Sequence, residues 1–518
     1  MGDSWFEAVA AVADGAPDAI AVRDGDTLLS YADLLTRVGR LARWLEEQGV
    51  VPGDRIGVQL RKGIEEILAT LACARLGVCF VHVHPQLTVP QVRHIALDSG
   101  MRMLIAEARR VDELAIDEEL GAAKLALVAI GERRAPGGLA WPALDQGPGT
   151  ERPLPDGDHL GALLYTSGST GKPKGVMHSG RNLRQFAANV AAYLDLRPTD
   201  RVLGLLPLSF GYGLNQLLST LHAGGTLVLQ KAPFAAEVLK TLVGVEITGL
   251  AAVPSVWGQL LGALDQQPTP LPALRYVTNA GGHLSEKNAR RLRAHLPHTD
   301  IVLMYGSTEA LRSTYLPAAL FDAKAGSIGL AIPNVEVFVV NAAGDLCQEG
   351  EVGELVHRGA HVSQGYWRNP EATALRFRSL PALRERCGDE AMYFSGDLVR
   401  RDADGILWFV SRSDWMVKSG GFRFSLSEVE ELLLQTGLVK QVVAFTVEDE
   451  ALGQAVQAVV VPSQPGATDP EALERQCWRT MAHYMIPKAF HVWPDGLPLL
   501  PNGKIDRPTL LRRVLGTP

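Results

Sequence analysis

The 518-residue sequence has no excess of basic charge and no long hydrophobic run. Its 50 Lys and Arg residues are outnumbered by 57 Asp and Glu residues, which gives a formal net charge of −7. This balance excludes the broad basic field that is typical of nucleic-acid-binding proteins. Charged residues or Gly interrupt every apolar stretch well before the about 18 residues that a membrane-spanning helix needs. We therefore expect neither nucleic acid binding nor a membrane span.

Cysteine is scarce, since the chain has five, widely spaced and without a CxxC pair. An odd number in a chain too long to need disulfides indicates free thiols in a reducing compartment. The N-terminal residues do not resemble a secretory signal, because Asp3 and Glu7 interrupt them and no basic region precedes an apolar run. We therefore expect a cytoplasmic protein. The cysteines are Cys73, Cys79, Cys347, Cys387 and Cys477.

What is present is the composition of an ordinary globular protein, 47% hydrophobic and 21% charged. At about 150 residues per domain, the length suggests roughly three compact units. Strand patterns at 55–60 and 78–83 flank a helical pattern at 64–76, which predicts βαβ units and a parallel sheet. Further strand patterns of this kind occur at 201–206, 226–229, 247–253, 276–279 and 301–305.

After about residue 330 the pattern changes to short strands between Asn, Gly and Asp turns, which predicts a β-rich subdomain. The segment 414–518 combines two helical patterns with two strands. We therefore predict an α/β fold. A large N-terminal domain over residues 1–412 would contain parallel-type α/β subdomains and the β-rich subdomain, and residues 413–518 would form a small mobile α+β domain.

The strongest local signal is the segment YTSGSTGKPKGV at 165–176, which follows an apolar run at 160–164. Its glycines allow backbone N–H groups to approach a phosphate. Its hydroxyl groups add hydrogen-bond donors, and its lysines supply positive charge. A polyphosphate-binding loop fits this chemistry.

Other interpretations of the loop fit less well. A Walker A loop needs four residues between Gly and Gly-Lys, whereas two separate Gly168 from Gly171, and Pro173 follows Lys172. An SxxK nucleophile made of Ser169 and Lys172 needs one helical turn, which Gly171 and Pro173 disfavour. A flexible Gly/Ser loop explains the glycines but not the adjacent lysines.

The loop resembles the phosphate-binding signature of the adenylate-forming superfamily, which includes acyl- and aryl-CoA synthetases, adenylation domains of peptide synthetases and beetle luciferases. Seven further segments resemble the motifs of this superfamily in the same order, so the resemblance covers essentially the whole chain. They are PLSFGYG at 207–213, NAGGH at 279–283, YGSTE at 305–309, SGDL at 395–398, SRSD at 411–414, KSGGFRFSLSEVE at 418–430 and PNGKIDR at 501–507.

The resemblance implies that ATP activates a carboxylic acid as an acyl-AMP, and it assigns roles to single residues. Glu309 would hold Mg²⁺, Thr308 would contact the α-phosphate, and Tyr305 would stack near adenine. Asp397 would accept the ribose hydroxyls, and Arg412 would contact the ribose or a phosphate. Without the resemblance, each of these residues has an ordinary structural interpretation; for example, Asp397 would be a turn-forming Asp and Arg412 a surface Arg. The other implied nucleotide-binding residues are Thr166, Ser167, Gly168, Ser169, Thr170, Gly171, Lys172, Lys174, Gly281, Gly282, Gly306 and Ser307.

The C-terminal motifs imply a second set of roles. Lys172, Lys174 and Mg²⁺ would screen the repulsion between carboxylate and triphosphate. Lys504 resembles the lysine that bridges the carboxylate and the α-phosphate during adenylation; without the resemblance it would be a solvated turn lysine. Thiol attack needs that space, and the superfamily resolves the conflict by rotating the C-terminal domain about a hinge, here Asp414. The loop that would then face the active site contains Lys418, Gly420 and Gly421.

The predicted acyl pocket contains Phe210, Gly211, Tyr212, Trp257 and Ala280, although the aromatic members could equally be core residues. Relatives that activate amino acids place an Asp soon after the Phe of this element, where it binds the substrate ammonium. Gly211 stands at that position here. A buried ammonium without a counter-ion costs several kcal/mol, so we predict that the substrate is not an α-amino acid. The stretch most resembles benzoate-type CoA ligases and small stand-alone acyl ligases.

These observations predict an AMP-forming acid–CoA ligase that acts on an aryl or medium-chain carboxylic acid. The implied cofactors are ATP, Mg²⁺ and coenzyme A, and a homodimer is possible. One alternative enzyme would load the phosphopantetheine thiol of a carrier protein. A second alternative is a non-catalytic, ligand-binding relative, which the retained Lys172, Glu309, Asp397 and Lys504 disfavour. His283, where relatives usually carry an acidic or smaller residue, keeps this alternative open.

Two other candidate sites are not predicted to be functional. His82 and His84 have the spacing of metal ligands on one face of a strand, but no Cys, Asp or third His is close in sequence. Glu428 and Glu430 lie two residues apart on a predicted helix and diverge. We therefore expect neither a zinc site nor a general acid/base pair.

Overall fold

The computed structural model describes residues 4–132, 138–167, 173–282, 284, 286–412, 416–464, 469–498, 505 and 507–516. The chain divides into two compact units. Unit 1 comprises residues 1–85, 89–166 and 174–413, and unit 2 comprises residues 414–518 with the short segments 86–88 and 167–173.

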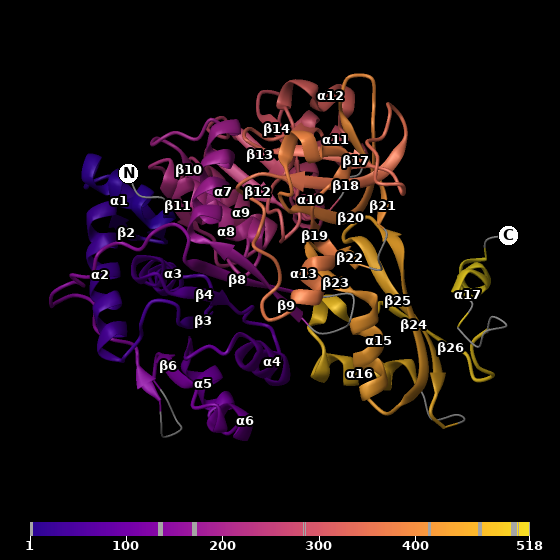
Figure 1. The fold of residues 1–518 in the computed structure, drawn as a ribbon, viewed down its shortest axis with the longest axis horizontal. Coiled ribbons are helices and arrows are strands. Elements are labelled where there is room, and N and C mark those ends of the chain that lie inside the picture. Colours follow the sequence, from indigo (N-terminus) through magenta and orange to yellow (C-terminus); the bar gives the residue numbers. More distant parts are fainter. Residues whose placement is uncertain are drawn as a thin grey trace. The chain divides into compact units, whose positions relative to one another are not determined.

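A nine-stranded sheet organises one half of unit 1, with the order β16-β15-β14-β13-β12-β10-β11-β1-β2. Figure 1 labels β2 and β10 to β14 of this sheet. The central strands are parallel, and β2, β15 and β16 are antiparallel to their neighbours. The strand bounds are β1 Ile20–Asp24, β2 Thr27–Ser30, β10 Arg201–Gly204, β11 Thr226–Leu229, β12 Gly249–Ala252, β13 Tyr276–Asn279, β14 Asp300–Tyr305, β15 Thr314–Leu316 and β16 Leu330–Ala331.

A seven-stranded sheet, order β7-β6-β5-β3-β4-β8-β9, organises the other half of unit 1. Strands β3 to β8 pair in parallel, with β4 between β3 and β8. The bounds are β3 Arg55–Gln59, β4 Cys79–His82, β5 Met103–Glu107, β6 Ala126–Ile130, β7 Leu139–Ala140, β8 Leu160–Ser167 and β9 Pro173–Ser179.

Five helices share one hydrophobic core with strands of both sheets, and they are α1 Trp5–Gly15, α2 Tyr31–Glu47, α3 Ile64–Leu76, α7 Gly180–Tyr193 and α8 Gly211–His222. Helix α2 begins where Ser30 and Asp33 form a reciprocal capping box. Successive side chains of a strand point to opposite faces of the sheet. On the nine-stranded sheet, Tyr276 therefore packs in this first core, whereas its neighbour Val277 packs in a second core on the other face. The second core includes residues of α9 Ala235–Gly244, α10 Pro254–Gln266, α11 Glu286–His295 and α12 Phe321–Lys324.

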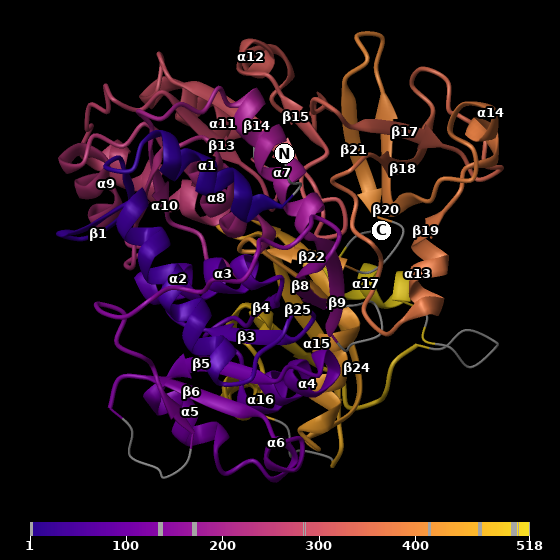
Figure 2. The same ribbon diagram turned by 60° about the vertical axis from the view of Figure 1, so that its left-hand side comes forward.

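A smaller sheet completes unit 1, with the order β17-β18-β20-β19 and β21 paired with β20 (Figure 2). Its pairings are antiparallel. One face packs with Tyr305 at the end of β14. The bounds are β17 Glu336–Val340, β18 Val352–Arg358, β19 Phe377–Arg378, β20 Met392–Arg401 and β21 Leu407–Arg412. The remaining helices are α4 Val89–Ser99, α5 Ala108–Leu114, α6 Glu118–Ala122, α13 Pro370–Arg376, α14 Arg384–Cys387 and the 3₁₀ turns Ala318–Leu320 and Pro381–Leu383.

Unit 2 contains a hairpin and a three-stranded sheet, order β24-β25-β26. One face of this sheet packs against α15 and α16, and the other packs against residues of α17. The bounds are β22 Met416–Ser419, β23 Phe422–Ser425, α15 Leu426–Gln435, β24 Val439–Asp449, β25 Gly453–Pro462, α16 Pro470–Thr480, the 3₁₀ turn His483–Met485, β26 Ala489–Val492 and α17 Arg507–Leu515.

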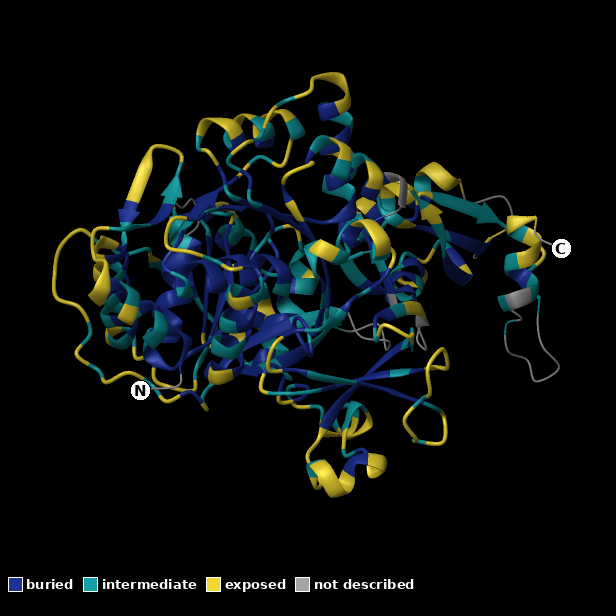
Figure 3. Ribbon diagram, turned by 90° about the horizontal axis from the view of Figure 1, so that it is seen from above, coloured by how far each residue is buried: buried dark blue, intermediate teal, exposed yellow. Residues whose placement is uncertain are grey.

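The observed topology confirms the predicted α/β class, with parallel sheets, a β-rich part after residue 330 and a small α+β unit at the C-terminus. Figure 3 shows the interior strands as mostly buried, whereas exposed residues lie along the peripheral turns and helices. Within the described ranges, no helix combines the length and the apolar character that crossing a membrane requires. All five cysteines are free.

Candidate active site

Several predicted site residues lie outside the described residues. They are Gly168, Ser169, Thr170, Gly171, Lys172, His283, Asp414 and Lys504. Ser167 ends β8 and Arg412 ends β21, but their side chains are also not described. Thr166 lies near the end of β8, and the half-buried Lys174 lies near the start of β9.

The YGSTE motif forms a tight loop directly after β14. Ser313 N–H donates to the carbonyl oxygen of Tyr305 at 3.0 Å, and Ala310 N–H donates to Ser307 Oγ at 3.2 Å. A Cβ atom at Gly306 would lie 1.7 Å from the carbonyl oxygen of Leu311. Only glycine therefore permits this approach, which turns the chain back at the carboxyl end of the strand.

Glu309 is buried at the end of this loop, with 5% of its surface exposed. Its Oε1 accepts a hydrogen bond from the Tyr366 hydroxyl at 2.8 Å. The Nζ of Lys174 lies 5.8 Å from the centroid of the same tyrosine ring. Burial lowers the pKa of Lys174, Arg376 adds to the decrease, and Glu309 opposes it. The structure therefore brings a predicted metal ligand and a predicted phosphate-binding lysine to the same tyrosine.

Tyr305 and Asp397 are joined directly, since the Tyr305 hydroxyl donates to Asp397 Oδ2. Asp397 is 2% exposed, and its backbone N–H donates to Ser395 Oγ at 3.1 Å. The ring of His357 stacks against the Tyr305 ring with centroids 6.2 Å apart. The residue predicted to stack near adenine and the residue predicted to hold the ribose therefore lie side by side.

Three buried histidines adjoin these residues and were not predicted from the sequence. His178 Nε2 lies 2.9 Å from the carbonyl oxygen of Thr308, and His361 Nε2 lies 3.3 Å from Ser313 Oγ. Burial lowers the pKa of His178 and of His357 to about 4 and that of His361 to about 3. All three are therefore neutral near pH 7. They lie far apart in sequence, so no local motif marks them as a group.

The Gly281-Gly282 loop follows β13. Gly281 has φ +81°, a conformation that favours glycine. Asn279 Nδ2 donates to the carbonyl oxygen of Gly282 at 3.1 Å, and Ala280 is buried. In contrast, Trp257 is 2% exposed and packs in the second core of the nine-stranded sheet, whereas Tyr212 and Ala280 belong to the first. The structure therefore does not bring Trp257 together with the other predicted pocket residues.

Phe210 and Gly211 lie at the start of α8, beside the YGSTE loop. A Cβ atom at Gly211 would lie 3.3 Å from Leu311 Cδ2. Tyr212 is buried, and its hydroxyl lies 2.6 Å from Thr278 Oγ1. This helix start therefore packs against the residues that follow Glu309.

The Gly420-Gly421 loop is the turn of the β22–β23 hairpin in unit 2. Both residues have positive φ, +58° and +90°, which favours glycine at each position. Gly420 N–H donates to the carbonyl oxygen of Leu452 at 3.0 Å, and Lys418 N–H donates to Gln454 Oε1 at 3.2 Å. The predicted thiol-step loop is therefore held against the β24–β25 turn of its own unit.

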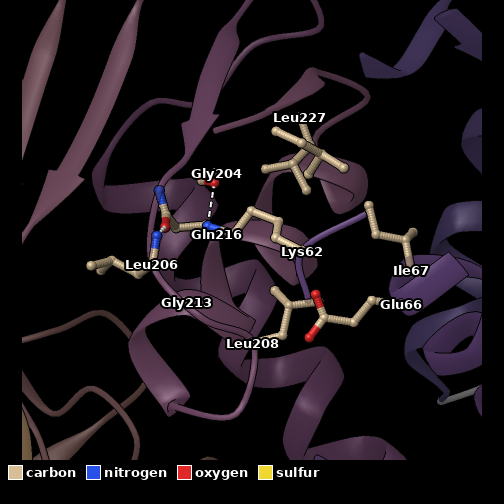
Figure 4. Close-up of a pocket in the computed structure, with 10 residues that line it drawn as sticks. Lys62, Glu66, Ile67, Gly204, Leu206, Leu208, Gly213, Gln216 and Leu227 are labelled. Atoms are coloured by element: carbon tan, nitrogen blue, oxygen red, sulfur yellow. Dashed lines mark hydrogen bonds between the residues drawn. The ribbon is translucent and has the colours of Figure 1, made fainter. Parts of the chain in front are cut away.

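A separate pocket in unit 1 is lined mostly by apolar residues, and Lys62, Glu66 and Gln216 are among the residues around it (Figure 4). Lys62 Nζ donates to the carbonyl oxygen of Gly204 at 2.6 Å. Burial lowers the pKa of Lys62 and raises the pKa of Glu66, because both charged forms lose solvation. None of the predicted site residues lines this pocket. It is therefore part of the packing beneath α8 and not the predicted active site.

Comparison with known families identifies the chain. A family model described as AMP-binding enzyme matches residues 9–367, and a model of the AMP-binding enzyme C-terminal domain matches residues 428–504. The chain belongs to the AMP-binding enzyme family. This membership confirms the predicted adenylate-forming superfamily and the prediction that the chain is an enzyme.

Individual relatives of this AMP-binding enzyme cover nearly its whole length. A feruloyl-CoA synthase from an Amycolatopsis species is 34% identical over 502 residues, which are 96% of each protein. A linear gramicidin synthase polypeptide of Brevibacillus parabrevis is 32% identical over 95% of this chain, but the chain spans only 6% of that protein.

Solved structures share the fold. The amide bond synthetase of Marinactinospora thermotolerans superimposes with a TM-score of 0.86 at 24% identity, covering 98% of this chain and 99% of that one. A double mutant of the o-succinylbenzoate CoA synthetase of Bacillus subtilis gives 0.83 at 24% identity, covering 98% of each chain. At this identity the likeness establishes the fold.

Proposed function

We propose that this AMP-binding enzyme converts a carboxylic acid into an acyl-AMP with release of pyrophosphate and then transfers the acyl group to the thiol of coenzyme A. The observation that carries the proposal is the convergence of Tyr305, Asp397, Glu309 and Lys174 in unit 1. The similarity to feruloyl-CoA synthase over 96% of both chains supports coenzyme A as the acceptor.

The nucleotide would lie along the YGSTE loop. The Tyr305 ring offers an aromatic face for adenine. A carboxylate accepts several hydrogen bonds, so the bond from Tyr305 to Asp397 is compatible with ribose hydroxyls as further donors. Thr308 would contact the α-phosphate, and the carbonyl of Thr308 is held at 2.9 Å from His178 Nε2. Because His178 is neutral, it adds no charge beside the phosphate.

The carboxylate of Glu309 suits Mg²⁺, a hard cation that is usually bound by one or two carboxylates together with substrate phosphates. Among the described residues, no group of three or more His, Cys, Asp or Glu side chains could hold a metal ion without such a substrate. Bound there, Mg²⁺ would neutralise negative charge on the triphosphate. The Tyr366 hydroxyl orients the carboxylate for this role.

The first half-reaction forms a bond between a carboxylate oxygen and the α-phosphorus and breaks the bond to pyrophosphate. Lys172 and Lys174 would attract the phosphates, and Lys504 would bridge the substrate carboxylate and the α-phosphate. In the second half-reaction the sulfur of the acceptor bonds to the acyl carbon, the thiol proton is released and AMP leaves. The Gly420-Gly421 turn would line the path of the thiol.

We propose an aryl or medium-chain acid as the substrate and not an α-amino acid. Gly211 offers no carboxylate to pair with a substrate ammonium, and Leu311, a hydrophobic residue, packs against it. The ring of Phe210, 5.4 Å from that of His84, would form an apolar wall.

A carrier protein is the second candidate acceptor, because several relatives, such as the linear gramicidin and bacitracin synthases, are peptide synthetases. The deciding experiment incubates the enzyme with an acid panel, ATP and Mg²⁺, and adds either coenzyme A or a phosphopantetheinylated carrier protein. We expect an acyl-CoA thioester by mass spectrometry. Acylation of the carrier protein alone would replace coenzyme A as the acceptor, and no thioester in either arm would contradict the second half-reaction.

We also propose a cellular compartment and an oligomeric state for this enzyme. Free thiols at all five cysteines fit a reducing cytoplasm. A homodimer is proposed with it, and light scattering of the purified enzyme measures the mass of the assembly directly. A mass of 55.8 kDa would correspond to the monomer.

A further inference from the structure

Arg312 is a buried cation three residues beyond Glu309. Only 5% of the surface of this residue is exposed. The guanidinium carbon lies 4.4 Å from the centroid of the Tyr212 ring, a cation–π contact with a predicted pocket residue. Such a residue calls for a compensating partner, because moving an unpaired guanidinium out of water costs several kcal/mol.

The hydrogen bonds of Arg312 are incomplete within the described part of the chain. Nη1 donates to the carbonyl oxygen of Leu311 at 3.1 Å, whereas Nε and Nη2 have no acceptor. Burial lowers the pKa of Arg312, and the groups that oppose this change are the phenols of Tyr193 and Tyr212. Among the described residues, no carboxylate contributes to stabilising the charge.

The hydroxyl groups of the neighbouring phenols contact other side chains, and within the described residues neither accepts a hydrogen bond from Nε or Nη2. The Tyr212 hydroxyl pairs with Thr278 Oγ1 at 2.6 Å. The Tyr193 hydroxyl lies 2.8 Å from Met304 Sδ, and its ring stacks on Tyr315 with centroids 4.6 Å apart. The guanidinium therefore faces aromatic rings, which favour a cation but accept no strong hydrogen bond.

The two unused groups define the shape of the missing partner. Nε and Nη2 lie along one edge of the planar guanidinium and present two parallel N–H donors. This edge matches the two oxygens of a carboxylate, which Arg binds in a bidentate manner. An anion there would offset the desolvation of Arg312, and a cationic group would be repelled.

Arg312 contacts residues of the predicted acyl pocket. Leu311, its neighbour, packs against the position of Gly211, and Arg312 itself covers Tyr212. A group held by Arg312 would therefore belong to the acyl part of the substrate.

We propose that Arg312 binds a second carboxylate at the far end of the acid, so that the substrate class is dicarboxylic acids of which one carboxylate is adenylated. This inference rests on the proposed function. It deepens the exclusion of α-amino acids, because the same guanidinium would repel an ammonium.

The test compares terephthalic, adipic and suberic acids with their monoamides in acid-dependent ATP–pyrophosphate exchange. For the wild type we expect at least one diacid to exceed its monoamide by about 100-fold in kcat/KM, because the amide has no negative charge and offers one acceptor oxygen where the carboxylate offers two. Arg312→Met should remove this preference, mainly by raising the KM for the diacid. Arg312→Lys should retain part of it.

Arg293→Met is the matched control. Arg293 also lies over an aromatic ring, 5.3 Å from the centroid of Phe321, but it is accessible and pairs with Asp322 at 3.0 Å. This variant should keep the diacid preference. Arg312→Met should melt no lower than the wild type, because it removes an unpaired buried charge. Diacid with a non-hydrolysable ATP analogue should raise the melting temperature of the wild type but not of Arg312→Met.

Two results would overturn the inference. One is a wild type that uses monoamides as well as diacids; the other is an Arg312→Met variant that loses both activities equally and melts lower. Titration calorimetry of the diacids with the ATP analogue separates this failure from failure of the proposed function. Diacid binding that depends on Arg312, without any ATP–pyrophosphate exchange, would contradict the proposed function alone. No diacid binding at all would overturn the inference.

Discussion

At the residue scale, the proposed role of Glu309 in binding Mg²⁺ requires a negative charge on a buried side chain. The Tyr366 hydroxyl donates to it at 2.8 Å, and Lys174 lies over the same ring. A hydrogen bond to the ionised form and a nearby cation both favour a carboxylate over a carboxylic acid. The residue is therefore suited to hold a divalent cation when the nucleotide binds.

Glu309→Gln keeps the size of this side chain and removes its charge. Acid-dependent ATP–pyrophosphate exchange should fall by more than about 100-fold, because charge that develops on the phosphates loses its counter-ion. The measurement is exchange as a function of Mg²⁺ concentration. Glu237→Gln, which changes a carboxylate on the outer helix α9, is the control and should have no effect. An active Glu309→Gln variant with an unchanged Mg²⁺ requirement would rule out this role.

The resemblance supplied the identities of the main candidate residues but not their partners. Tyr305 and Asp397 are 92 residues apart in sequence, and Glu309 and Tyr366 are 57 apart. The first pair depends on how β14 meets the small antiparallel sheet, and the second depends on the segment after β18, where Tyr366 forms a bridge with Val176 of β9. No local sequence pattern indicates either pairing. Arg312 belongs to no motif, and only its burial without an acceptor makes it a candidate.

At the element scale, the strands of the parallel sheets were predictable because most of their residues are buried and their sequences are mostly apolar. The division into a nine-stranded and a seven-stranded sheet was not predictable. β4 lies between β3 and β8, and β10 lies between β11 and β12. This order follows from tertiary packing of the shared helices and leaves no signal in any single strand.

Helix α15 buries a carboxyl group in unit 2, and this makes stability depend on pH. Burial, with a contribution from Glu431, raises the pKa of Glu428 from its ordinary 4.5 to about 8. Between these values the folded protein holds a proton that the unfolded chain has released. Its stability therefore falls as the pH rises through this window, by at most about 1.4 kcal/mol per pH unit.

Glu428→Gln should remove this dependence. We expect an unchanged melting temperature near pH 4.5 and a higher one than the wild type above pH 8, measured by calorimetry of the full chain. Glu448→Gln, which alters a carboxylate near the end of β24, should show no such crossover. Equal effects of the Glu428 substitution at both pH values would contradict the raised pKa.

At the scale of the whole molecule, each unit has its own hydrophobic core. The predicted division of labour places nucleotide and acid on unit 1 and Lys504 with the thiol-step loop on the C-terminal part of the chain. Such an arrangement allows one active site to meet the opposite demands of two half-reactions, since each would use a different domain orientation.

Lys504→Ala tests this division. The substitution should abolish adenylation, because the carboxylate and the α-phosphate lose the cation that bridges them. Thioester formation from supplied acyl-AMP and coenzyme A should continue at nearly the wild-type rate. The two half-reactions are measured separately, by pyrophosphate exchange and by thioester release. An equal loss in both would show that Lys504 serves the fold or both steps alike.

The whole molecule is proposed to activate a carboxylic acid as its adenylate. The most direct measurement is the exchange of labelled pyrophosphate into ATP by the wild-type enzyme, with and without each member of a panel of aryl and medium-chain mono- and dicarboxylic acids. We expect exchange that requires both Mg²⁺ and an acid, and none with α-amino acids. A folded enzyme that shows no exchange with any carboxylic acid, or exchange driven only by amino acids, would contradict it.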